Sequence, residues 1–193
     1  MKRMATLIAA IAVIGVPSAH AQNHGEVGAY IDYFRLTSSN TNFAGIGGRA
    51  SLNVTKHMQL EAEINYDFNE VFTERFTNPS TRVITSERSN IRVLHGLFGP
   101  KIQTGGGHFR AFATVKGGFA NFRFDPRAAT FNTFASSVDD LRANNVSAAL
   151  YPGVGGEAYL GPIGLRLDVG DEIYFNNGTH HNWRASFGPN IRF

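Results

Sequence analysis

The last eleven residues of the chain, 183–193, alternate strictly between two kinds of side chain. Counting back from the end, every second residue is apolar: Phe193, Ile191, Pro189, Phe187, Ala185 and Trp183. The residues between them are polar or small: Arg192, Asn190, Gly188, Ser186 and Arg184. Successive side chains of a β-strand point to opposite faces, so this stretch predicts a strand with one apolar and one polar face. Pro189 removes one ladder hydrogen bond and predicts a bulge or a local weak point there.

Similar alternation recurs along the rest of the chain. The strands it predicts are 26–35, 43–54, 58–68, 89–102, 108–123, 146–160, 165–175 and 183–193. Short connections alternate with longer ones, and the two longest are predicted polar loops over 70–88 and 125–144. Short turns at one rim and long loops at the other are typical of transmembrane β-barrels. The pattern therefore predicts an all-β fold: a single antiparallel up-and-down transmembrane barrel of about eight strands.

The first 21 residues have the pattern of a secretory signal peptide. Lys2 and Arg3 precede an apolar run over 7–16, and Ala19-His20-Ala21 is a small-x-small cleavage site. The apolar run is about half the roughly 20 residues that a spanning helix needs, which argues against a membrane anchor. We expect residues 1–21 to be cleaved and residues 22–193 to form one barrel domain.

The composition excludes several classes of protein. Two of the 18 basic residues and none of the 15 acidic ones lie in the signal peptide, so the net charge of the mature chain falls from +3 to +1 and does not indicate nucleic-acid binding. There is no Cys, so no disulfide stabilises the fold. No stretch after residue 21 is long and apolar enough for a spanning helix, so a membrane-spanning form must be a closed barrel.

The predicted inward faces of the strands carry charges of both signs. The candidate lumen residues are Arg49, Glu61, Glu63, Arg92, Lys116, Glu157, Arg166, Asp168 and Arg184. The interior of an eight-stranded barrel is just wide enough to be filled by side chains, and buried charges must pair. We therefore predict that Glu61 or Glu63 pairs with Arg92 or Lys116. By the same reasoning, Glu157 pairs with Arg166 or Arg184, and the lumen is plugged.

With its apolar outside, polar inside and terminal aromatic residue, the chain resembles the small outer-membrane barrels of the OmpA transmembrane-domain and OmpX kind, without a peptidoglycan-binding domain. The resemblance implies residence in the outer membrane of a Gram-negative-type bacterium, in contact with its lipid. It also implies that the barrel assembly machinery reads the last strand through Phe187, Ile191 and Phe193, and that loops 70–88 and 125–144 can meet surface ligands. A soluble lipocalin-like barrel is the alternative, but it would have an apolar interior.

Catalytic, metal and cofactor sites are not expected. The carboxylate pair Glu61 and Glu63 could suit a glycosidase, but a plugged lumen would admit no sugar. No His is followed two residues later by Ser, as a deacylase-like site would need, and His180-His181 reads as a solvated loop. We expect no enzyme but a structural or surface-interaction protein. A narrow ion-conducting pore is the alternative, and a lipid-modifying enzyme is the third possibility. Aromatic residues near strand ends are predicted to form interface girdles: Tyr66, Phe68, Phe119, Phe122, Phe124, Tyr174, Phe175 and Trp183.

Overall fold

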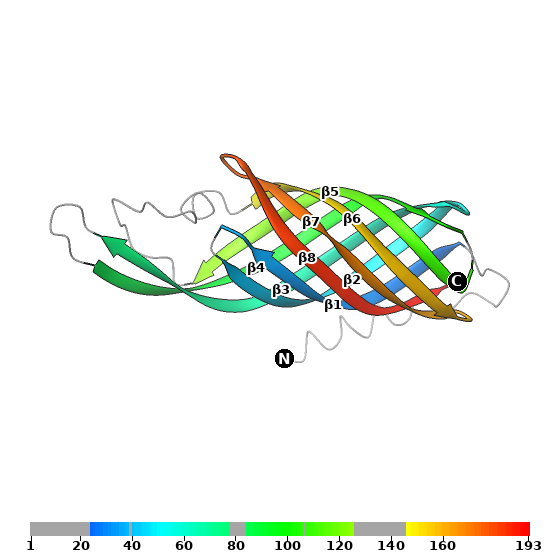
Figure 1. Cartoon of the computed structure of the whole chain (residues 1–193), viewed down its shortest axis with the longest axis horizontal. Coiled ribbons are helices and arrows are strands. Elements are labelled where there is room, and N and C mark those ends of the chain that lie inside the picture. The colour runs from blue at the N-terminus through cyan, green and yellow to red at the C-terminus, as the bar shows by residue number, and fades with distance from the viewer. Residues whose placement is uncertain (1–23, 39, 78–83, 106, 126–145) are drawn as a thin grey trace, which may run out of the picture.

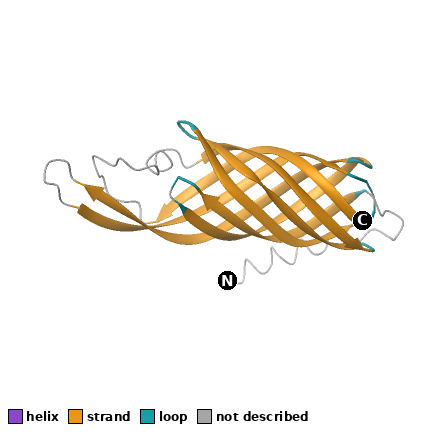
Figure 2. Cartoon of the chain, in the orientation of Figure 1, coloured by secondary structure: helices purple, strands orange, loops and turns teal. Residues whose placement is uncertain are grey.

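The fold is a closed antiparallel barrel of eight strands, each paired with its neighbours in the chain and the last paired with the first (Figures 1 and 2). The computed structural model describes residues 24–38, 40–77, 84–105, 107–125 and 146–193. Within this part of the chain no helix is long and apolar enough to cross a membrane. The strands are β1 (Gly25–Leu36), β2 (Thr41–Thr55), β3 (Met58–Thr77), β4 (Ile84–Gln103), β5 (Phe109–Asp125), β6 (Val146–Leu160), β7 (Ile163–Phe175) and β8 (Thr179–Arg192).

The two ends of the barrel differ in their connections. At one end, called the short-turn end, β2–β3, β4–β5 and β6–β7 are joined by two to five residues. The start of β1 and the end of β8 also meet at this end. The Phe193 carbonyl accepts hydrogen bonds from the backbone N–H groups of His24 and Gly25. The opposite, long-loop end carries the connections β1–β2, β3–β4, β5–β6 and β7–β8. This is the predicted arrangement of rims.

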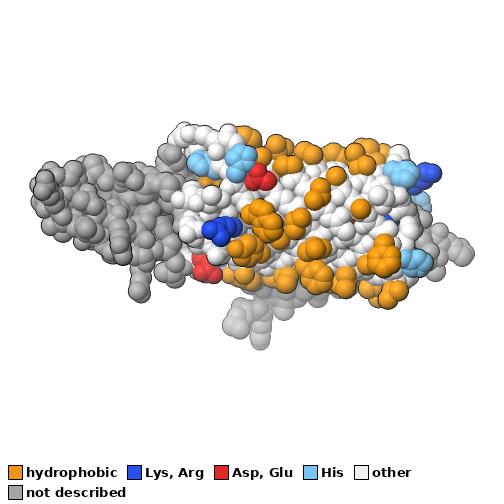
Figure 3. All heavy atoms as spheres, viewed as in Figure 1, with side chains coloured by type: hydrophobic (Ala, Val, Ile, Leu, Met, Phe, Trp, Pro, Cys, Tyr) orange, Lys and Arg blue, Asp and Glu red, His pale blue; other side chains and the backbone are white. Residues whose placement is uncertain are grey.

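The outer surface of the barrel is apolar and its inner surface is mostly polar. Large exposed side chains such as Ile31, Ile64 and Leu167 face outward from different strands. They form a broad apolar belt, and the charged side chains visible in Figure 3 gather towards the two ends. Of the predicted girdle residues, Tyr66, Phe68, Phe119, Phe175 and Trp183 are exposed on this outer face. Phe122 and Tyr174 are instead buried inside the barrel, and the side chain of Phe124 lies outside those described.

The third and fourth strands are longer than the sequence pattern predicted. The prediction of a loop over residues 70–88 is wrong, because all of these residues except 78–83 belong to β3 or β4. β2 pairs with β3 only as far as Asp67, and β5 pairs with β4 only from Asn90. Residues 72–77 and 84–89 therefore pair only with each other among the described residues, as a two-stranded ribbon projecting beyond the barrel (Figure 1). We call this ribbon the β3–β4 arm.

Three prolines on the outer face interrupt the strand ladders. Pro100, Pro152 and Pro189 are all exposed, and two residue pairs are missing from the ladder to the next strand around each of them. In all three places the pairing resumes in the same register. Proline has no N–H to donate, which accounts for the gaps. Pro189 is thus a local weak point in the β8–β1 seam rather than a bulge. The predicted loop 125–144, apart from its first residue, and the predicted signal peptide lie outside the described residues.

Candidate functional site in the barrel lumen

The long-loop end of the lumen is filled by apolar side chains. Phe34 and Leu36 on β1, Phe43 on β2, and Ile91 on β4 are fully or almost fully buried there. Among the described residues, the buried apolar side chains in contact are Phe34, Leu36, Phe43, Ile91, Val93, Leu97, Ala120, Phe122, Ala149, Tyr151 and Tyr174. An apolar layer in the lumen of a transmembrane barrel excludes water and ions from that section of the interior.

This layer explains the misplacement of Arg92. On this part of β4 the inward-facing residues are Ile91, Val93 and His95, all buried, so the intervening Arg92 points outward. The prediction that Arg92 lies in the lumen is therefore wrong. It rested on the rule that apolar side chains face lipid and polar ones face the lumen, and that rule reverses locally where the lumen itself is apolar.

Beneath the apolar layer, Arg184 on β8 contacts three carboxylates from three other strands. Its Nε lies 3.0 Å from Asp32 Oδ1, and its Nη1 lies 2.8 Å from Glu63 Oε1 and 3.1 Å from Glu172 Oε2. Its Nη2 also donates to the Tyr30 hydroxyl at 3.2 Å. All these side chains are almost completely buried. Arg184 is therefore the hub of the upper part of a charged network.

His95 lies between two carboxylates at the same level. Its Nε2 is 2.7 Å from Asp67 Oδ2, and its Nδ1 contacts Glu172 Oε1. The Asn65 side-chain amide donates to the other oxygen of Asp67 at 3.0 Å, and the Phe34 ring packs edge-on against the imidazole. Each ring nitrogen of His95 thus faces a carboxylate oxygen, which can accept a hydrogen bond. This arrangement suits an imidazolium, in which both ring nitrogens donate. His95 joins the charged network to the apolar layer above it.

The middle of the lumen is organised around Glu61 on β3. Arg166 binds it with two parallel hydrogen bonds, Nη1 to Oε2 at 2.5 Å and Nη2 to Oε1 at 2.9 Å. Lys116 Nζ bridges the two glutamates of β3, 2.7 Å from Glu61 Oε1 and 2.6 Å from Glu63 Oε2. Bidentate arginine–carboxylate pairs of this kind combine two charge-assisted hydrogen bonds, which are stronger than hydrogen bonds between neutral groups. Because Glu63 also binds Arg184, the middle and upper parts form one network.

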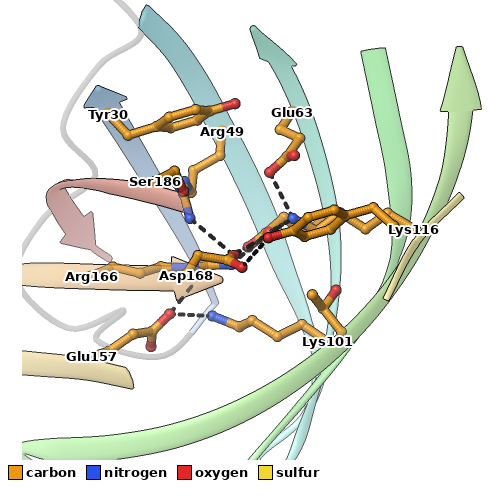
Figure 4. Close-up of polar contacts among 12 residues, drawn as sticks. Tyr30, Arg49, Glu63, Lys101, Lys116, Glu157, Arg166, Asp168 and Ser186 are labelled. Carbon is orange, nitrogen blue, oxygen red and sulfur yellow. Dashed lines mark hydrogen bonds and ion pairs between the residues drawn. The ribbon is translucent and has the colours of Figure 1, made fainter. Parts of the chain in front are cut away.

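Asp168 on β7 is the second acidic centre of the middle section. One of its oxygens accepts from Arg166 Nη2 at 2.7 Å and lies 3.6 Å from Arg49 Nη1, and the other accepts from the Tyr151 hydroxyl at 2.7 Å. Arg49 also donates to the Ser186 hydroxyl at 2.9 Å and lies over the Tyr30 ring. Figure 4 shows Arg49, Lys116 and Asp168 pointing toward one another from different strands. Aromatic rings thus fill the space between the charges.

A third group of charges occupies the short-turn end of the lumen. Lys101 Nζ is 2.5 Å from Glu157 Oε1 and 3.3 Å from Glu26 Oε2. Arg110 Nη1 lies 2.6 Å from the other oxygen of Glu26. Glu157 Oε1 is also 3.4 Å from Arg166 Nη1, which connects this group to the middle of the barrel. The ion pairs therefore run continuously from the short-turn end of the lumen to the apolar layer.

The charges inside are nearly balanced. Among the described residues, eight buried acids face six buried lysines and arginines, and His95 is the seventh potential cation. The same part of the chain has no group of three or more His, Asp or Glu side chains arranged to hold a metal ion. Every acid and base of the network contacts an oppositely charged partner on another element or strand position, so the arrangement suits cross-strand bracing of the barrel.

Most of the predicted lumen residues lie in this network. The structure brings together Arg49, Glu61, Glu63, Lys116, Glu157, Arg166, Asp168 and Arg184. Lys116 contacts both Glu61 and Glu63, and Arg166 contacts Glu157, as two of the expected pairings require. Arg184 binds Asp32, Glu63 and Glu172 rather than Glu157.

Several members of the network were not singled out from the sequence. These are Glu26, Asp32, Asp67, His95, Lys101, Arg110 and Glu172. Asp32 and Asp67 lie on faces that the alternation already marked as inward, so the same signal could have found them. His95 could not be found this way, since it stands among apolar residues on its strand. Phe187 and Ile191 are exposed on the outer face, and Phe193 is half-buried against Gly25.

Comparison with known proteins identifies the fold. No protein-family model and no curated protein sequence matches the chain. Among solved structures, it is similar to Ail, the attachment invasion locus protein of Yersinia pestis, solved in complex with the heparin analogue sucrose octasulfate. The TM-score is 0.51 and the sequence identity 12%, and the alignment covers 88% of this chain and 97% of Ail. It is also similar to the Neisserial surface protein A, with a TM-score of 0.54 and 8% identity over 88% of this chain and 96% of that one.

The fold and its surfaces define the class of protein. A closed eight-stranded antiparallel barrel with an apolar outer belt and a charged interior is a transmembrane β-barrel. Ail and the Neisserial surface protein A share this barrel fold. The chain is therefore an eight-stranded outer-membrane β-barrel with a buried ion-pair network. In such barrels the short turns face the periplasm, so the long-loop end is extracellular.

Proposed function

We propose that this barrel is a surface-interaction protein whose lumen is structural and whose contacts are made at the extracellular end. The observation that carries the proposal is the filling of the lumen by ion pairs and an apolar layer. A narrow ion-conducting pore needs a continuous water path, and the ion pairs and apolar side chains occupy that space. A lipid-modifying enzyme would need a nucleophile and base outside this network, and nothing in the sequence pattern marks such a pair.

The β3–β4 arm is the surface we assign to the interaction. Its two segments, 72–77 and 84–89, pair with each other and, among the described residues, with no further strand. Open strand edges present unpaired backbone N–H and C=O groups that an extended partner segment can join. The arm thus fits a protein partner that contributes a β-strand, recognised largely through its backbone.

Charge does not favour a polyanionic partner. The segments 70–88 and 125–144 contain six acidic and five basic residues together: Glu70, Glu74, Glu87, Asp125, Asp139, Asp140, Arg75, Arg82, Arg88, Arg127 and Arg142. Ail was solved with a heparin analogue, and sulfated sugars of that kind usually require an excess of basic residues. We therefore propose protein, rather than sulfated polysaccharide, as the partner class.

Removing the arm tests this function. Replacing residues 71–90 by Asn-Gly leaves Glu70 and Ile91 as the flanking pair of a two-residue hairpin, the commonest kind of hairpin turn. The shortened protein should still fold, which a heat-modifiable gel shift checks. Liposomes that carry it should lose the binding of the parent to an immobilised extracellular protein built of β-strands, such as fibronectin, while neither form should bind immobilised heparin. Equal binding by both forms, or parent binding no better than that of empty liposomes, would reject the proposal.

A further inference from the structure

Two arginines lie side by side on the outer face of the barrel near its extracellular end. Arg92 on β4 and Arg123 on β5 are directly opposite each other in the ladder. Their neighbours Val93 and Phe122 are buried in the lumen, so both arginines point outward. Arg123 is exposed and Arg92 is half-buried.

The two neighbouring positive charges repel each other. Side chains directly opposite on adjacent strands have Cβ atoms about 4.5–5.5 Å apart, and like charges there destabilise the sheet. The described residues give neither guanidinium a carboxylate within ion-pair distance. Glu70 on β3 is opposite Ile91, whose side chain is buried in the lumen. Glu70 therefore shares the inner face of the sheet with Ile91, and the two arginines lie on the outer face. By contrast, each buried arginine of the network has at least one carboxylate partner.

The position of the pair indicates what could neutralise it. Leu94 and Phe119, nearer the middle of the same two strands, face outward within the apolar belt, and Phe68 is exposed on neighbouring β3. Beyond them the outward side chains become polar, with Asn121 followed by the two arginines. The guanidinium groups therefore lie at the boundary between the hydrocarbon layer and the extracellular headgroup region, where long basic side chains extend toward the interface.

We propose that Arg92 and Arg123 form a binding site for the phosphate group of an outer-leaflet lipid. Two guanidinium groups provide planar, forked donors that match phosphate oxygens, and one phosphate between them removes their mutual repulsion. The acyl chains of the same lipid lie against Leu94, Phe119 and Phe68 below. The site thus combines a charged upper part with an apolar lower part. It is independent of the interaction assigned to the β3–β4 arm.

The test uses three lipids or ions and four variants of the whole protein. Lipid A, lipid A without its phosphates, and inorganic phosphate are each titrated into the folded barrel in neutral detergent, and native mass spectrometry counts the molecules retained. The variants are Arg92→Gln, Arg123→Gln, the double variant, and Arg35→Gln. Arg35 is the matched control, because it is an exposed outward arginine at the same end but on β1, where it donates to Asn40.

The parent should retain lipid A and bind dephosphorylated lipid A at least about tenfold more weakly, as expected for losing charge-assisted hydrogen bonds. Each single variant should weaken lipid A binding about tenfold, while Arg35→Gln should leave it unchanged. Equal binding of the dephosphorylated lipid, or an equal loss in Arg35→Gln, would overturn the site. Binding of inorganic phosphate as tight as that of lipid A would overturn the lipid as its ligand. The heat-modifiable gel shift of every variant shows that a loss of binding is not a loss of fold.

Discussion

Replacing Arg184 by methionine is expected to lower the free energy of unfolding by about 3–5 kcal/mol, the usual cost of removing one partner from a buried ion pair. Arg184 is almost completely buried and contacts Asp32, Glu63 and Glu172. Glu63 would keep Lys116, and Glu172 would keep His95. Asp32 would lose the one cation that contacts it in the described part of the barrel and would be left as a buried, uncompensated charge.

Urea unfolding in lipid vesicles, followed by the fluorescence of the single tryptophan, measures this loss. Arg192→Met is the matched control on the same strand: Arg192 is half-buried, and its Nε donates to the Gly161 carbonyl, so at most about 1 kcal/mol should be lost. Adding Asp32→Asn to Arg184→Met should recover part of the stability, because it removes the stranded charge. If Arg184→Met were no less stable than Arg192→Met, the network would not brace the barrel.

Changing Phe193 to glutamate is expected to leave most of the newly made protein unassembled while costing the folded barrel little. The Phe193 carbonyl accepts two backbone hydrogen bonds and its N–H donates to the Gly25 carbonyl, and a substitution keeps all three. Its ring is half-buried against Gly25. The expected assembly defect comes from the loss of the terminal aromatic group that the resemblance to outer-membrane barrels assigns to the assembly machinery.

The measurement compares the amount of heat-modifiable protein in the membrane with the stability of the same variant refolded from urea. Phe109→Glu is the control, since Phe109 is 82% exposed at the same end of the barrel but on β5. A charge on the lipid face near an interface costs roughly 0–1 kcal/mol, so both variants should refold in vitro. Phe193→Glu alone should fail in cells. Normal membrane levels of Phe193→Glu, or an equal defect in Phe109→Glu, would show that the last residue carries no assembly signal.

The barrel could be predicted from the sequence because period-two alternation directly reports the two faces of a strand. Glu61 and Glu63 on β3, and Arg166 and Asp168 on β7, were placed in the lumen on that basis. The alternation gives the face of a strand but not the height of a residue in the barrel. Which acid meets which base depends on strand register and tilt, so the contacts of Arg184 with Asp32 and Glu172 could not be read from spacing.

The errors arise where the inside of the barrel is apolar. Phe122, Tyr174 and Ile91 line the extracellular end of the lumen, so hydrophobicity no longer distinguishes the two faces of a strand there. Arg92 was assigned to the wrong face for this reason, and the aromatic residues Phe122 and Tyr174 were assigned to a girdle. Correct placement requires the pairing with β5, in which Arg92 is opposite Arg123.

The length of the β3–β4 arm was also missed. Residues 70–88 contain polar residues and Pro79, a composition that reads as a loop. Pro79 lies within 78–83, between the two strands, while the segments on either side include β-branched and aromatic residues that favour extended structure, such as Val71, Phe72 and Ile84. A two-stranded ribbon outside the lipid needs no apolar face, so the alternation that marks spanning strands is not required there.

The central claim is that the lumen is closed and structural, and the conductance of the purified barrel in planar bilayers tests it most directly. The parent should give no steady current above that of a protein-free bilayer, because ion pairs and the apolar layer fill the interior. Glu61→Ala and Glu63→Ala, measured beside it, should be less stable to urea by about 3–5 kcal/mol each, with at most a small leak. A large, steady conductance in the parent would contradict the closed lumen and make the protein a pore.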